Sequence, residues 1–201
     1  MMRPFTAALV ALAALTTGCT SGRARVFSAS PVTGLDVSID EAFYVVAGRT
    51  PWELNRDLRR GALRHEGERW QGLTRFRVSY SYRAEQDDAA CRPGRPRVAV
   101  ELVTTLPRWD DRAVAPEALR TDWDLFLSRL RAHEAGHHRI AIGVGHALLD
   151  EVAALEAPDC AALRRRAAAL ARSYRASVTE EQKAWDDETA HGLRAPEPTG
   201  L

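Results

Sequence analysis

"WDLFLSRLRAHEAGHHRIAIGVGHALLDEV", residues 123–152, is the stretch that decides the fold. Its apolar side chains recur every three or four positions, which is typical of one buried face of a helix. Thr121 can cap the first turn, and Pro158 ends the pattern. The sequence therefore predicts one long helix, whose inward positions are Trp123, Phe126, Leu127, Leu130, Ile140, Ala141, Val144, Leu148, Val152 and Leu155.

The flanking segments predict the rest of the domain. Residues 160–185 have the apolar spacing of a second long helix. Residues 75–82 and 97–103 alternate polar with apolar side chains, which favours an antiparallel pair of half-buried strands. A short strand at residues 43–46 precedes a helix at residues 50–61, which opens with a Thr50–Glu53 capping box around Pro51. We expect an α+β fold: a small antiparallel sheet packed on two long helices.

The N-terminus has the organisation of an export signal. Arg3 is followed by an apolar run that is too short to span a bilayer, and the run ends in Thr16-Thr17-Gly18-Cys19. A small residue directly before a cysteine predicts a lipoprotein-type signal peptide at residues 1–18, with Cys19 as the lipidated first residue of the mature chain. Because Thr16 stands where an aliphatic residue is commoner, an ordinary cleaved signal peptide and a secreted soluble protein remain the alternative.

The expected product is a lipoprotein of the periplasm or cell envelope, attached to a membrane by its N-terminal lipid. Residues 19–40 are rich in small and turn-forming residues and predict a flexible tether. Residues 41–193 predict a single domain, and residues 194–201, with Pro196 and Pro198, predict a disordered tail. The chain holds 28 Lys and Arg against 27 Asp and Glu, and this balance argues against nucleic acid as a partner.

The cysteines agree with export. If Cys19 carries lipid, Cys91 and Cys160 are left as a pair in an oxidising compartment. We expect them to form a disulfide that closes a long loop. A thiolate metal site is the weaker interpretation, because neither cysteine belongs to a C-x-x-C pair.

The middle of the long helix carries the candidate chemistry. The inward positions between Leu130 and Ile140 fall on His133 and His137, which are four residues apart and project from one face. Two imidazoles in this arrangement can share a zinc ion, and Glu134 lies beside them where a carboxylate can take a proton from water. The small Ala135 and Gly136 are expected to leave room for metal, water and a substrate carbonyl. This H-E-x-x-H pattern makes the helix zincin-like.

A catalytic zinc needs a third protein ligand. If the two long helices form an antiparallel hairpin, Glu180 and Glu181 match the distance from turn to motif better than His191, which lies just past the second helix. Spacing alone leaves His191 and the two glutamates open. Asp186 or Asp187 could orient a ligand imidazole. Among the other histidines, His138 is expected to face solvent, and His65 and His146 have no partner at metal-binding spacing.

Several motifs together resemble a bacterial family of unknown function described as predicted secreted zinc-dependent proteases. The resemblance covers the chain from about residue 43 to 192 and favours His191 as the third zinc ligand, within a terminal pattern D-x-x-T-x-H-G. Trp185 stands where that pattern is expected to have tyrosine. The motifs are residues 44–50 with Glu53-Leu54, Leu106-Pro107-Arg108-Trp109, H-E-A-G-H at 133–137, Cys91 with Cys160, and residues 186–192.

The leading hypothesis is a zinc metallopeptidase of the cell envelope that binds one Zn²⁺ per chain through His133, His137 and His191. Glu134 would act as general base on a peptide or protein substrate. Two alternatives use the same residues differently. One is a non-catalytic periplasmic scaffold with a structural zinc, and the other is a zinc amidase that acts on peptidoglycan.

Overall fold

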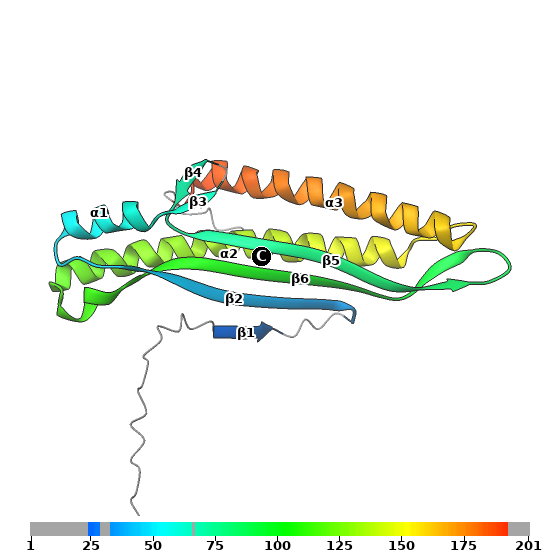
Figure 1. Ribbon diagram of the computed structural model, residues 1–201, viewed down its shortest axis with the longest axis horizontal. Coiled ribbons are helices and arrows are strands. Elements are labelled where there is room, and N and C mark those ends of the chain that lie inside the picture. Colours follow the sequence, from blue (N-terminus) through cyan, green and yellow to red (C-terminus); the bar gives the residue numbers. More distant parts are fainter. Residues whose placement is uncertain (1–23, 29–32, 66, 193–201) are drawn as a thin grey trace, which may run out of the picture.

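The computed structural model describes residues 24–28, 33–65 and 67–192. The predicted signal peptide, Cys19 and the predicted tail at 194–201 lie outside the described residues. Figure 1 shows long strands and two long helices running side by side along the molecule. The elements are β1 (Ala24–Ser28), β2 (Leu35–Val46), α1 (Pro51–Gly61), β3 (Leu63–His65), β4 (Glu68–Trp70), β5 (Leu73–Gln86), β6 (Cys91–Trp109), the 3-10 helix η1 (Asp110–Val114), α2 (Glu117–Ala153) and α3 (Cys160–Thr189).

The predicted α+β class is confirmed, and the sheet differs from the prediction in one respect. β5 and β6 form the expected antiparallel pair, with Thr74 opposite Thr104. The four-stranded order is β1-β2-β6-β5, and β2 runs parallel to β6. The chain leaves β2, passes through α1 and the β3–β4 hairpin, and reaches β6 only after β5. Because β6 is parallel to β2 on one side and antiparallel to β5 on the other, the sheet is mixed rather than antiparallel.

Residues 24–28 and 35–40, both within the predicted tether at 19–40, form strands of the sheet. β2 begins at Leu35, inside the range assigned to the tether, and Leu35 is buried against the helical core. Residues 35–40 pair with β6 along their whole length, and their side chains point alternately to the two faces of the sheet. These residues are therefore part of the domain. The small and turn-forming residues that precede Leu35 led to the prediction of a tether instead of this strand. The ordered domain therefore starts before the predicted boundary at residue 41.

Helix α1 forms as its sequence predicts. Oγ1 of Thr50 accepts a hydrogen bond from the amide of Glu53 at 3.3 Å, and Oε2 of Glu53 accepts one from the amide of Thr50 at 3.1 Å. These two bonds satisfy donors that the first turn of a helix leaves free. The opposite face of α1 buries Leu54 and Leu58 against Val46 and its neighbours.

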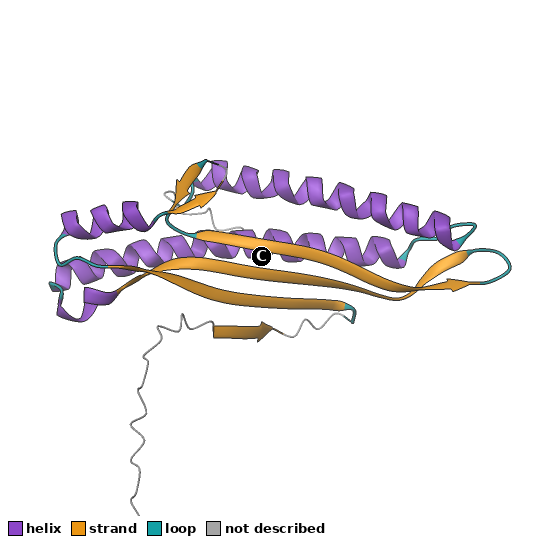
Figure 2. Ribbon diagram, in the orientation of Figure 1, coloured by secondary structure: helices purple, strands orange, loops and turns teal. Residues whose placement is uncertain are grey.

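The two long helices have boundaries slightly different from those predicted. α2 begins at Glu117 rather than Thr121, directly after Pro116, and the hydroxyl of Thr121 donates to the Glu117 carbonyl inside the helix. Proline suits the entry to a helix because its fixed φ matches and its missing N–H costs no bond there. α3 continues to Thr189, four residues beyond the prediction. Figure 2 shows α2 and α3 lying side by side, joined by a short connection.

The main core lies between the sheet and α2. β6 contributes alternate buried residues, and α2 meets them with the stripe predicted from its sequence. At one end Cys91 and Cys160 form the predicted disulfide, with their Cα atoms 5.1 Å apart, so the start of β6 is tied to the start of α3. Within the described part of the chain, no helix has the length and hydropathy needed to cross a membrane. The core residues are Leu35, Val98, Val100, Leu102, Ala141, Leu148, Leu149 and Val152.

Candidate metal centre

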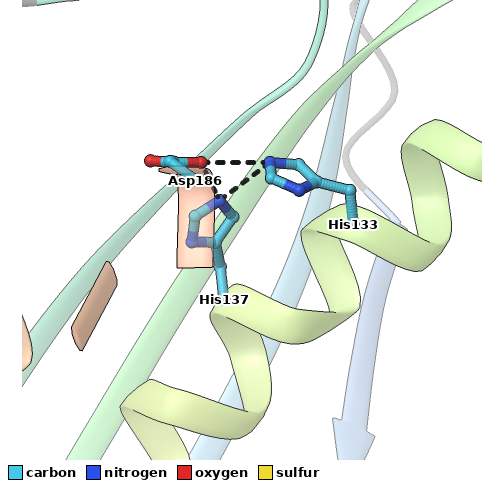
Figure 3. A group of neighbouring side chains, drawn as sticks. All are labelled: His133, His137 and Asp186. Atoms are coloured by element: carbon cyan, nitrogen blue, oxygen red, sulfur yellow. Dashed lines mark hydrogen bonds and ion pairs between the residues drawn. The ribbon is translucent and has the colours of Figure 1, made fainter. Parts of the chain in front are cut away.

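His133 and His137 lie one turn apart on α2 and turn the same way, as their spacing predicts. Their Nε2 atoms are 3.1 Å apart. Asp186 of α3 reaches the same point: its Oδ1 is 3.2 Å from Nε2 of His133 and 3.1 Å from Nε2 of His137 (Figure 3). His133 is buried, His137 is largely buried, and Asp186 is partly covered. These three side chains are the group in the described chain whose ligand atoms could hold a metal ion.

The outer nitrogens of both rings are fixed by α3. The hydroxyl of Thr189 donates to the Trp185 carbonyl at 2.7 Å, so toward Nδ1 of His133, 2.9 Å away, it acts as acceptor. Oε1 of Gln182 accepts from Nδ1 of His137, since an amide oxygen has no proton to give. Both neutral rings therefore carry their proton on Nδ1 and turn the lone pair of Nε2 toward Asp186. Partners of this kind orient histidine ligands in metal sites.

Two lone pairs and a carboxylate oxygen that face one another repel unless a cation lies between them. Oδ1 of Asp186 is buried and has no partner with hydrogen-bond geometry in the described part of the chain. Zinc–ligand bonds of about 2.0–2.1 Å place tetrahedral ligand atoms roughly 3.3 Å from one another. The three measured separations, 3.1, 3.2 and 3.1 Å, are slightly shorter than that value. The donor set therefore fits a small divalent cation.

The electrostatics of the three groups are mutually dependent. Burial raises the pKa of Asp186, but the two imidazoles outweigh this effect and hold its pKa well below the usual range. Burial lowers the pKa of His137, but the nearby Asp186 carboxylate and the Gln182 amide oxygen outweigh this effect and hold the pKa above its ordinary value. Without a metal, a proton is thus the cation that this cluster attracts.

Glu134 lies beside the cluster and belongs to a chain of hydrogen bonds that runs from α2 to β5 and β6 and back to α2. Oγ1 of Thr74 donates to Oε2 of Glu134 at 2.7 Å, and the hydroxyls of Thr74 and Thr104 are 2.9 Å apart. His138 ends the chain, with Nε2 2.7 Å from Oγ1 of Thr104. Each hydroxyl has one proton, so the bonds all run from His138 toward the carboxylate. Burial raises the pKa of Glu134, and the Thr74 bond partly opposes it.

His138 therefore does not face solvent as expected. Its ring is half-buried against the sheet, and burial lowers its pKa. The prediction about Gly136 was also wrong, because the room it leaves is taken by another side chain. A Cβ atom at Gly136 would lie 2.1 Å from Cε2 of the Trp185 indole, whose Nε1 donates to the His133 carbonyl at 3.0 Å. Gly136 thus lets α3 approach α2 closely enough to deliver Asp186.

The structure places His191 at the rim of the cluster. Its Nδ1 is 3.8 Å from Oδ1 of Asp186, its side chain is 45% exposed, and its ring meets Trp70 edge-on. Residues 190–192 all have positive φ, which turns the chain sharply at the end of α3. Gly192 suits this turn because it lacks a Cβ, and a Cβ there would lie 3.1 Å from Cβ of His133.

The other candidate ligands lie elsewhere. Glu180 and Glu181 are exposed on α3, and Glu181 accepts a bond from Ser177. Asp187 is exposed, whereas Asp186, expected only to orient a ligand, contributes an oxygen to the cluster itself. Sequence reasoning missed Gln182 and Thr189. A signal was present, since residues 182, 186 and 189 share one face of a helix.

A cavity opens directly in front of the cluster. It measures about 260 Å³ and is bounded by β4, the two residues that link β4 to β5, α2 and His191. Gly72 brings the backbone close to the site, because a Cβ there would lie 2.5 Å from Oε1 of Glu134. Both the carboxylate and one candidate ligand are therefore reachable from one opening. The lining residues are Glu68, Arg69, Trp70, Gln71, Gly72, Leu130, His133, Glu134 and His191.

Fold and site together define a small α+β domain with a candidate metal cluster on a helix hairpin. Residues 41–192 match the model of a family of bacterial proteins of unknown function, DUF922. The chain belongs to this family. No curated protein and no solved structure matches it.

Proposed function

We propose that the protein is a zinc-dependent hydrolase of peptide bonds, with the metal held by His133, His137 and Asp186. The observation that carries the proposal is that three donor atoms converge on one point, next to the Glu134 carboxylate, which lines a cavity. When bound, the zinc ion would supply a Lewis acid that polarises the substrate carbonyl and makes water more acidic.

Glu134 supplies the proton transfers in this proposal. Thr74 holds Oε2 of Glu134, and Oε1 lies beside Gly72 at the cavity. Oε1 is therefore the atom that would take a proton from the attacking water and return it to the departing nitrogen. The raised pKa of Glu134, caused by burial, suits a group that must both accept and release a proton.

His191 has a different role in this proposal from the one expected. Its half-exposed ring lines the cavity, next to Trp70. There it would contact the substrate, orienting the carbonyl oxygen by hydrogen bonding. We further propose that the domain works outside the cytoplasm, attached through Cys19, because a disulfide persists in oxidising compartments and the N-terminal sequence is of the export type.

Replacing Glu134 with glutamine tests the proposal. Zinc content should stay at one per chain, while hydrolysis of a quenched fluorogenic peptide library should fall by about 10²–10⁴-fold. The matched control is Glu180→Gln, an exposed carboxylate on α3 that should change neither quantity. Equal hydrolysis by the wild type and Glu134→Gln would exclude catalysis at this site and favour a structural metal. Cleavage of peptidoglycan fragments but of no peptide would assign the amidase alternative.

A further inference from the structure

A positively charged surface adjoins the cavity of the candidate site. Helix α1 buries Leu54 and Leu58 and turns its opposite face outward. That face carries Trp52, which is 68% exposed, with the Arg56 guanidinium 4.7 Å from the centre of its ring. We call the set formed by Trp52, Arg56, Arg59, Arg60 and Arg69 the basic surface.

The arginines of the basic surface lack ion-pair partners among the described residues. Several exposed arginines elsewhere are paired, such as Arg97 with Asp36 and Arg112 with Asp124. The two carboxylates of α1 are already engaged with backbone amides: Glu53 caps the helix, near Arg56, and Asp57 accepts from the Ala47 amide at 2.8 Å. The positive charge of this face is therefore left to interact with something other than the domain.

The basic surface encloses a hollow that shares a residue with the candidate site. Its cavity measures about 320 Å³ and is lined by Trp52, Asn55, Arg56, Arg59, Arg60 and Arg69. Arg69, on β4, lines this hollow and also the cavity in front of His133 and Glu134. Its Nη1 donates to the Arg59 carbonyl at 2.8 Å and ties the hairpin to α1. A peptide bound in the cavity of the candidate site can thus extend past the Arg69 side chain onto α1.

The charges also indicate which part of a ligand lies where. The cavity side carries Glu68, Glu134 and Asp186, which disfavour a second carboxylate beside the metal. Over α1 the side-chain charge is positive instead of negative. Guanidinium groups bind carboxylates in a bidentate geometry. Arg56 and Arg60 are separated by about 6 Å of helix, close to the length of two residues of an extended peptide.

We propose that the basic surface binds an acidic segment of the polypeptide whose neighbouring bond lies in the cavity, so that the enzyme prefers substrates with Asp or Glu flanking the cleaved bond. That the bound segment is a substrate rests on the proposed function. The binding of an acidic segment to the basic surface does not depend on hydrolysis. Phosphate groups of an anionic membrane could also meet arginines, but Arg69, which lines both cavities, favours a ligand that reaches the site.

The binding arm of the test uses a fluorescein-labelled oligoglutamate and an oligoglutamine of the same length. Each is titrated by anisotropy against the zinc-loaded Glu134→Gln protein at low salt. Oligoglutamate should bind about tenfold more tightly, and the preference should vanish in Arg56→Gln/Arg59→Gln/Arg60→Gln, because each exposed pair contributes modestly. Arg164→Gln/Arg165→Gln/Arg172→Gln, which removes as many exposed charges from α3, should retain it.

The second arm measures cleavage of two peptide pools that differ only by Asp and Glu or Asn and Gln at flanking positions. The acidic pool should be cleaved faster, and only the α1 variant should lose this ratio. Oligoglutamate binding that the α1 and α3 variants retain equally would overturn the inference while leaving hydrolysis intact. Binding of phosphatidylglycerol vesicles through the α1 arginines, without preference for oligoglutamate, would overturn it in favour of a membrane surface. Specific binding without cleavage would support the basic surface and remove the proposed function.

Discussion

Oγ1 of Thr189 lies 2.9 Å from Nδ1 of His133, although 56 residues separate them. The hydroxyl donates to the Trp185 carbonyl and so accepts the imidazole proton, which leaves Nε2 of His133 free to bind a cation. The helix that provides Asp186 thus also sets the tautomer of a ligand on the neighbouring helix. Asp186 and Thr189, three residues apart on α3, thus both reach the His133 ring.

Thr189→Val should weaken zinc binding without removing the ligands. Valine keeps the volume but offers no acceptor to Nδ1, so the ring loses its orientation, and affinity should fall by about 10–100-fold. Competition with a fluorescent zinc chelator measures the change. Thr179→Val on the exposed face of α3 is the matched control and should bind as the wild type does. An unchanged zinc affinity in Thr189→Val would mean that the hydroxyl only stabilises the last turn of α3, through its bond to the Trp185 carbonyl.

Asp186 and His191 can be separated as candidate ligands by metal content. Asp186→Asn should lose the stoichiometric zinc, because the amide carries no charge and its oxygen is a weak ligand. His191→Asn should retain one zinc per chain and lose turnover, since its ring lies at the cavity rim, 3.8 Å from Asp186. Plasma emission spectrometry of the purified variants measures the content. The reverse result, zinc lost only in His191→Asn, would restore the ligand set expected from sequence.

The sequence predicts those parts of the fold and site that depend on local periodicity. The i, i+4 spacing of His133 and His137 places both rings on one face wherever the helix packs, and the Thr50–Glu53 capping box forms within a single turn. What depends on packing between helices was not predictable. Asp186 reaches the histidines because Trp185 fits against Gly136, a contact that fixes how far α3 extends along α2. Counting residues from the turn treated the two helices as ideal, so it matched the motif to Glu180 and Glu181, left His191 open and did not point to Asp186 as a ligand.

Gly136 offers a test of that packing. Alanine at this position would place its Cβ 2.1 Å from the Trp185 ring, so α3 must shift and the free energy of unfolding should fall by about 1–3 kcal/mol. Gly143→Ala is the control on the same helix, where a Cβ meets nothing within 4 Å. That variant should gain about 0.5–1 kcal/mol from helix propensity. Urea unfolding without metal measures both, and equal effects would show that the indole does not limit the approach of α3.

Thr74→Val should alter the pH dependence of the proposed catalysis. The Thr74 hydroxyl lowers the pKa of Glu134 against the larger effect of burial, so removing it should raise that pKa further. A general base works only when ionised. A higher pKa therefore shifts the acidic limb of the kcat/KM profile to higher pH, and activity is lost chiefly on the acid side and regained as pH rises. Thr74→Ser, which restores the donor, should return the limb toward its original position.

The control for this variant is Thr105→Val, one residue beyond the partner of Thr74 on β6 and on the opposite face of the sheet. It should leave the profile unchanged. A uniform loss of activity at every pH in Thr74→Val, with no displacement of the limb, would mean that Thr74 holds the shape of the cavity rather than the charge state of Glu134. In that case serine would rescue activity only as far as it restores packing, and the bonds that lead back to Thr104 and His138 would have no part in the reaction.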